Sequence, residues 1–334
     1  MRVRSLDRGF TLIELLIAIF LGMLVMSGGY MVFQSSNRAT REQNLDNRMQ
    51  DNARVAMDVL TRNFRRAGFL VNFTSYPLNQ RVDNQLSKLV TVNSNAGPDQ
   101  VIIVGGTLTT IGSLQKSVDS KEATLVLTPG SDMTKINVDA TDPLKKNSVI
   151  GVGLTFSGVV DGKNNGTKTI TLNTTVPTGA TNMYYPGVKL QDGVTDSNQT
   201  PAPVRLLTAT QYGIDSATNA AHPVLQQTTQ GTTEPIAEDI EDLQIAYGVD
   251  RNNNRIIEAG EWTYSPLANE IDKIRLVRVT LVARTAQPDP LLVNVSQTIP
   301  AIEDRPARPV TDGYRRYILT RIIKTNNLDA VFTL

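Results

Sequence analysis

Cysteine is absent from this chain of 334 residues, and histidine and tryptophan occur once each. The missing cysteines exclude disulfides, thiolate nucleophiles and cysteine-ligated zinc. A histidine-based zinc site or a Ser-His-Asp triad would depend on His222 alone, which lies in a polar stretch before Pro223. We therefore interpret His222 as a solvated loop residue and predict that the chain is not an enzyme.

An excess of charge of one sign is also lacking, because 33 basic and 32 acidic side chains give a net charge of +1. No global field then attracts nucleic acid or an acidic substrate. Several basic residues do gather near the C-terminus, but acidic residues lie among them. A solvated face is therefore favoured there over a DNA-binding surface. The residues concerned are Arg305, Arg308, Arg315, Arg316, Arg321 and Lys324.

The N-terminus combines a short basic segment with a long apolar run over residues 10–33. At about 1.5 Å per residue, such a run makes a helix of about 36 Å, enough to cross a hydrocarbon core of about 30 Å. Arg2, Arg4 and Arg8 precede the run and no comparable cluster follows it directly. This asymmetry predicts a single-pass membrane helix, with the N-terminus in the cytoplasm and the remainder in the periplasm or outside the cell.

Glu14 is the one charged residue within the apolar run. A carboxylate in a spanning helix costs about 2.5–3.5 kcal/mol at the bilayer centre and less near the interface. Two interpretations stay open, an idle carboxylate near the membrane surface or an acid that has a partner. A cut after Gly9 would create such a partner, the new α-amino group of Phe10 on a neighbouring subunit.

The residues Gly9-Phe10-Thr11-Leu12-Ile13-Glu14-Leu15 resemble the signature of type IV prepilins. The resemblance implies that a prepilin peptidase removes residues 1–9 and methylates Phe10, and that Glu14 helps to dock the subunit into a fibre. Two alternatives are a secretory signal peptide cut near Ser27-Gly28-Gly29 and an uncleaved anchor. Both leave the Gly9-Phe10 pair and Glu14 unexplained.

Helical periodicity continues beyond the apolar run. One apolar stripe recurs at spacings of three and four residues, through Leu45, Met49, Ala53, Met57, Leu60, Phe64 and Ala67. Basic residues in the last turn and Gly68 after it predict that the helix ends near Ala67. The sequence thus predicts a transmembrane part over 10–33 and an amphipathic part over 34–67.

The residues from 68 to 334 predict a β-rich head, so the fold class is α+β, with the long helix packed on a mainly antiparallel sheet as in pilins. A hairpin loop is expected at 161–166 and a long surface insertion at about 179–235. Candidate strands, rich in β-branched residues, are 100–104, 123–128, 148–156, 167–173, 242–249, 273–283, 291–296 and 316–324.

Residues 250–261 match the oxygen spacing of a twelve-residue EF-hand-type calcium loop. Ile256 would contribute its backbone carbonyl at position 7, whereas Arg255 occupies position 6, where glycine is usual. An asparagine-rich hairpin without a metal is the alternative. The predicted Ca²⁺ ligands are Asp250, Asn252, Asn254, Ile256, Glu258 and Glu261.

Several segments in the helix and in the last hundred residues resemble the W-type (PilW-like) minor pilins. They include Tyr247-Gly248-Val249-Asp250 and Tyr314-Arg315-Arg316-Tyr317. The resemblance implies a minor pilin of the priming complex that starts a type IV pilus and lies near its tip. Implied partners are prepilin peptidase, other minor pilins, the major pilin and a large tip adhesin. A J-type pseudopilin of a type II secretion system is the alternative.

Overall fold

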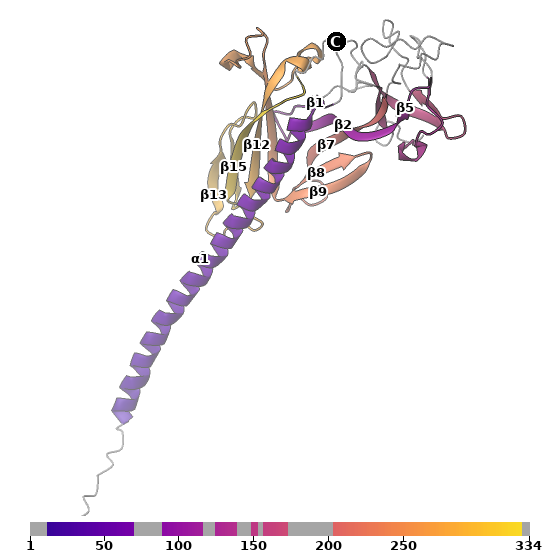
Figure 1. Cartoon of the computed structure of the whole chain (residues 1–334). Helices are drawn as coiled ribbons and strands as arrows, with labels where there is room; N and C mark the ends of the chain where they lie inside the picture. The colour runs from indigo at the N-terminus through magenta and orange to yellow at the C-terminus, as the bar shows by residue number, and fades with distance from the viewer. Residues whose placement is uncertain are drawn as a thin grey trace, which may run out of the picture. The chain divides into compact units, whose positions relative to one another are not determined.

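The computed structural model describes residues 12–69, 89–115, 124–138, 148–152, 156–172 and 203–328. The chain forms two compact units, Met1–Arg48 and Met49–Leu334. Helix α1 (Leu12–Arg66) occupies most of the first unit and the beginning of the second, and antiparallel strands follow it (Figure 1). This arrangement confirms the α+β class.

The second half of α1 packs through the stripe that the sequence predicts. Met49, Ala53, Met57, Leu60 and Phe64 are all buried in the core of the second unit. The helix ends at Arg66, and Gly68 takes a left-handed φ of 75° while its N–H donates to the Val104 carbonyl at 2.8 Å. A residue with a Cβ is strained in that conformation, so the glycine explains the helix end.

A nine-stranded sheet holds the first part of the head, in the order β1-β2-β7-β4-β5-β6-β3, with β8 pairing with β7 and β9. Every pairing in it is antiparallel. The strands are β1 (Leu89–Val92), β2 (Gln100–Ser113), β3 (Thr124–Val126), β4 (Val149–Val152), β5 (Phe156–Asn164), β6 (Thr169–Leu172), β7 (Pro203–Asp215), β8 (Val224–Thr229) and β9 (Thr232–Glu238).

A four-stranded antiparallel sheet holds the last part, in the order β11-β10-β12-β15. A two-stranded ribbon, β13-β14, completes the strands. The bounds are β10 (Ile240–Val249), β11 (Trp262–Thr263), β12 (Ile274–Arg284), β13 (Val293–Ile299), β14 (Arg308–Asp312) and β15 (Arg316–Lys324), with 3₁₀ turns η1 (Met133–Lys135), η2 (Ala259–Glu261) and η3 (Ala268–Lys273).

One hydrophobic core joins the helix to both sheets. Phe64 and Leu60 of α1 share it with Tyr212 of β7, Leu243 of β10 and Val279 of β12. Strand β10 is buried along almost its whole length, which is permitted by the apolar residues between Leu243 and Val249, interrupted only by Gln244. Polar groups placed on this strand are therefore held in a dry, rigid setting.

The predicted surface insertion is wrong for residues 203–231, whereas residues 179–202 lie outside the described residues. Strand β7 pairs with β2, β4 and β8 and lies within the nine-stranded sheet. Its threonines and glutamines looked typical of a loop, but strands tolerate them because one face of an antiparallel strand can stay polar. All eight candidate strands overlap observed strands, and the hairpin at 161–166 is confirmed between β5 and β6.

Candidate functional site

Glu14 lies in the first turn of α1. Negative charge is favoured at a helix N-terminus because the backbone N–H groups there are not used within the helix. Gly9 and Phe10, the predicted cleavage and methylation residues, lie outside the described residues. The structure therefore places the predicted docking acid on a helix and leaves the cleavage site as a sequence prediction.

The first half of α1 presents apolar side chains on every side. All residues from 12 to 33 are exposed, including Leu16, Phe20 and Phe33. Among the described residues, α1 is the one helix that is long and apolar enough to span a membrane by length and composition. A helix that is apolar all round requires a lipid or protein environment that covers it.

Residues 250–261 form a curled loop between β10 and β11, which is the predicted calcium loop. Asp250 is fully buried at its start, and its Oδ2 accepts hydrogen bonds from the Arg255 N–H at 3.0 Å and from Arg275 Nε at 2.6 Å. At the other end, Glu261 Oε1 accepts from the Arg251 N–H at 3.0 Å. Carboxylates from both ends thus tie down the backbone of this loop.

The asparagines of the loop make similar short-range contacts. Asn252 Oδ1 accepts from the Asn254 N–H at 2.9 Å, and Asn254 Oδ1 accepts from the Ile256 N–H at 2.7 Å. Arg255, at position 6, has a φ of 67°, the left-handed conformation that glycine adopts at that position in EF-hand loops. The backbone therefore makes the expected sharp turn despite the arginine.

Ion pairs with residues outside the loop hold the 250–261 loop in place. Burial alone would raise the pKa of Asp250, but hydrogen bonds from Arg275 and the Arg255 N–H outweigh it and hold that pKa below its usual value. Arg251 Nε donates to Glu270 of η3 at 2.7 Å, and this hydrogen bond lowers the pKa of Glu270. Both carboxyl groups are therefore ionised at neutral pH.

Three further observations bear on a metal. The Oδ1 atom of Asp250 is buried without any hydrogen-bond partner. Ile257, at position 8, packs over Gly248 of β10, where an added Cβ would lie 2.9 Å from Ile257 Cγ2. In the part of the chain that the structure describes, no three histidine, cysteine, aspartate or glutamate side chains converge as a metal cluster. Any cation held here would therefore depend on amide and carbonyl oxygens as well.

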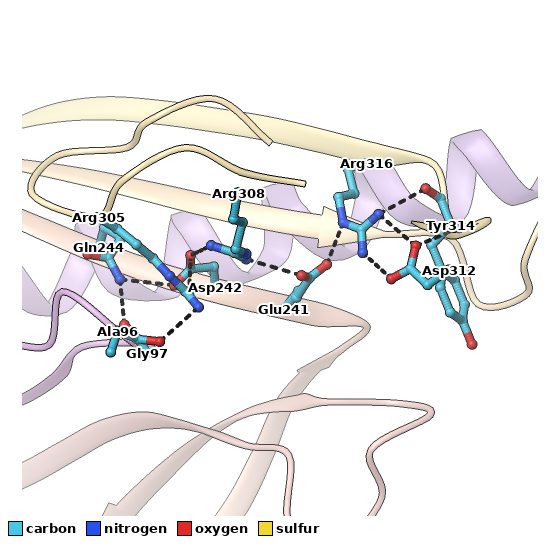
Figure 2. Close-up of polar contacts among 10 residues, drawn as sticks. All are labelled: Ala96, Gly97, Glu241, Asp242, Gln244, Arg305, Arg308, Asp312, Tyr314 and Arg316. Carbon is cyan, nitrogen blue, oxygen red and sulfur yellow. Dashed lines mark hydrogen bonds and ion pairs between the residues drawn. The ribbon is translucent and has the colours of Figure 1, made fainter. Parts of the chain in front are cut away.

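Three of the six basic C-terminal residues, Arg305, Arg308 and Arg316, form an ion-pair network, which corrects the prediction of a solvated face for these three. We call it the arginine network, and its members are Glu241, Asp242, Arg305, Arg308, Asp312 and Arg316 (Figure 2). Asp242 is fully buried, and Arg305 and Arg308 both pair with its Oδ2. The Arg316 side chain is only 8% exposed, between Glu241 and Asp312.

The arginine network connects segments that are far apart in the sequence. Arg305 Nη2 donates to the Ala96 carbonyl at 3.2 Å, and Gln244 Nε2 donates to the Gly97 carbonyl at 2.8 Å and to Asp242 Oδ1 at 3.0 Å (Figure 2). Sequence reasoning missed it because Glu241 and Asp242 precede their arginine partners by more than sixty residues. The alternation of arginine with apolar residues near the C-terminus was the one available signal.

His222 also has a partner. Its Nδ1 lies 2.8 Å from Oδ1 of Asp239, a buried residue, although the histidine side chain itself is 42% exposed. The predicted solvated position is therefore only partly correct.

Two known sequence families match parts of this chain. The family of type IV pilus-assembly protein W (PilW) matches residues 195–327, and the prokaryotic N-terminal methylation motif matches residues 4–30. The chain is a type IV pilin of the PilW type. The motif of this pilin implies processing by prepilin peptidase and association with other pilins, after anchoring of its apolar helix in the membrane.

A type IV-like pilin from Thermus thermophilus has a similar solved structure at a TM-score of 0.38 and 12% identity, covering 85% of this chain and 98% of the other. No curated protein sequence matches the pilin significantly. The PilW match, over residues 195–327, includes β10, the 250–261 loop and the arginine network.

Proposed function

We propose that this pilin is a minor subunit of a type IV pilus that acts in the priming complex near the fibre tip. The observation that carries the proposal is the apolar half of α1, exposed on every side, with Glu14 in its first turn and the methylation motif over residues 4–30. Such a helix can move from lipid into a fibre core without exposing apolar surface to water, since both environments are dry. The head has a hydrophobic core of its own and stays outside the membrane.

The docking step follows from electrostatics. After a cut between Gly9 and Phe10, the new α-amino group of one subunit and the Glu14 carboxylate of its neighbour have opposite charges. A charge pair in a low-dielectric core is strongly favoured over either charge alone. The leader orientation puts the N-terminus in the cytoplasm and the head in the periplasm, where other minor pilins, the major pilin and a tip adhesin are the expected partners.

The mature N-terminus tests the processing step. Mass spectrometry of the purified pilin is expected to find N-methylated Phe10 as its first residue. A Gly9→Val variant, with a side chain at the cut, is expected to retain residues 1–9. A parent protein that begins at Met1, or near Tyr30 as a secretory signal peptide would leave it, contradicts the proposal.

Incorporation into fibres tests Glu14. The Glu14→Ala variant is expected to accumulate in the membrane and to be depleted from sheared fibres by about tenfold or more, since an unpaired α-amino group in a dry core is costly. Glu42→Ala is the matched control, because Glu42 lies on the same helix outside the apolar part and pairs with Arg38 at 2.8 Å. Equal depletion of both variants would show that Glu14 has no special role.

A J-type pseudopilin of a type II secretion system is the second candidate, because its helix and size are similar. Deletion of the gene separates the two. Loss of surface fibres and of twitching motility supports the minor pilin, whereas accumulation of exported proteins in the periplasm supports the pseudopilin. The PilW match favours the first.

A further inference from the structure

We propose that the 250–261 loop is a calcium site in the head of this pilin. The proposal goes beyond the role of the subunit in assembly, and it stands or falls independently of it. The central observation is Asp250, which is fully buried yet leaves Oδ1 without a partner while Oδ2 is fully engaged. A buried carboxylate oxygen without a hydrogen bond is costly, so such an atom indicates a ligand that the protein chain does not supply.

The two carboxylate oxygens of Asp250 differ in their contacts, and this difference fits the first position of a calcium loop. Its Oδ2 is held by the Arg255 N–H and by Arg275 Nε, which fixes the orientation of the carboxylate. Its Oδ1 is then available to bind a cation through one oxygen. The Arg275 side chain comes from β12, the neighbouring strand, so the orientation does not depend on the loop alone.

Five other groups bring oxygens at the remaining positions of the pattern, and one of them is the exposed carboxylate of Glu258 at position 9. Asn252 Oδ1 and Asn254 Oδ1 each accept one backbone hydrogen bond and retain a second lone pair. Ile256 would contribute its backbone carbonyl, because it occupies position 7 of the pattern. Glu261 is buried and accepts from the N–H groups of Arg251 and Glu258, which draws the two ends of the loop together.

The donor chemistry selects calcium. All the candidate groups are hard oxygens, from carboxylates, amides and a carbonyl, and calcium takes six to eight of these in flexible geometry. Zinc and copper prefer imidazole or thiolate, which the loop lacks, and magnesium demands a strict octahedron. The dissociation constant should lie in the range of extracellular modules, about 10⁻⁴–10⁻³ M, because three arginines offset the three carboxylates.

A bound ion would stabilise the end of the four-stranded sheet. The loop begins at the end of β10 and leads into β11, which pairs back on Tyr247 and Gly248. The Asp250 N–H donates to the Lys273 carbonyl at 2.9 Å, just before β12 begins. Calcium would therefore fasten the end of β10 that leads into the loop.

Trp262 makes the site directly measurable. It is the sole tryptophan of the chain, it follows Glu261 in the sequence, and the Arg278 guanidinium lies 4.4 Å from the centre of its ring. We expect terbium, which shares the ligand preferences of calcium, to show luminescence sensitised by this tryptophan in the full-length pilin in detergent. Calcium is expected to displace it and to raise the melting temperature by about 2–4 °C at saturation.

Three variants and one control test the assignment. Glu258→Gln, at an exposed position, and Asp250→Asn are each expected to weaken calcium binding by about tenfold, because each removes one ligand charge. Arg255→Gly is expected to strengthen it several-fold, because glycine adopts the left-handed backbone without strain and one positive charge is lost. Asp161→Asn, an exposed carboxylate on β5, is the control and should leave binding unchanged.

Distinct results would overturn the proposal. A folded parent protein that shows neither sensitised terbium emission nor a calcium-dependent melting shift lacks the site. Terbium emission that persists unchanged in Glu258→Gln and Asp250→Asn places the ion elsewhere. Arg255→Gly guards against misfolding as an explanation, because a variant that gains affinity must be folded.

Discussion

The two ends of strand β10 each place a buried aspartate beside arginine, and the two sites differ in how completely the acid is satisfied. At the first end, Asp242 Oδ2 pairs with Arg305 and Arg308, and its Oδ1 accepts from Gln244. At the other end, Asp250 pairs with Arg275 and keeps one oxygen without a partner. Both oxygens of Asp242 are thus used in contacts that connect segments of the chain, whereas one oxygen of Asp250 is available to a ligand.

A third buried acid in contact with β10 extends the comparison. Asp99 accepts hydrogen bonds from the N–H groups of Ser94 and Ile245, both at 2.8 Å. Among the described residues no arginine pairs with it, and burial raises its pKa to about 6 although these hydrogen bonds oppose the change. Asp250, which has an arginine partner, thus has a lowered pKa, whereas Asp99, without one, has a raised pKa.

The largest effect should come from Asp242. Asp242→Ala is expected to lower the free energy of unfolding by about 3 kcal/mol, because it leaves Arg305, a largely buried side chain, without its acidic partner and leaves Arg308 with Glu241 alone. Chemical denaturation of the purified pilin measures the loss. Asp312→Ala is the matched control from the same arginine network and should cost less than about 1 kcal/mol, since that side chain is 36% exposed and Arg316 keeps Glu241. Equal losses would remove the distinction between buried and exposed members.

Asp99 should make stability depend on pH. The native state binds this proton more tightly than the unfolded chain, in which the pKa is near 3.8, so stability falls as the pH rises from about 4 to 6. The expected loss is about 2 kcal/mol, followed through the melting temperature between pH 4 and 7. Asp99→Asn should remove this slope whatever its overall stability. Glu270 and Asp312, whose pKa values are lowered by hydrogen bonds from arginine, act in a separate window below about pH 4.

The smallest of the three effects should come from Asp250 without calcium. In the presence of a chelator, Asp250→Ala is expected to cost about 1–2 kcal/mol, because the change removes one ion pair but also one unsatisfied oxygen. The same denaturation experiment with saturating calcium should show a larger difference between parent and variant. A loss in chelator as large as that of Asp242→Ala would mean that Asp250 serves only as a structural acid.

Local features of the sequence predicted the helix, most of the strands and the loop. The stripe from Met49 to Ala67 and the left-handed Gly68 are properties of neighbouring residues, so periodicity alone was sufficient for them. Strand β7 was missed because its polar residues resemble a loop until β2, β4 and β8 pair with it. The pairing partners of a strand are not encoded in its own composition.

By itself the sequence determined a leader motif, an apolar helix with one acid, an amphipathic continuation and the oxygen spacing of residues 250–261. These follow from the order of residues along a few turns or one loop. Only the tertiary structure decided that Asp242 meets Arg305 and Arg308, and that Asp250 meets Arg275 but keeps one oxygen free. The reason is physical, since the charge state and the partners of a buried group depend on which distant segments fold against it and exclude water.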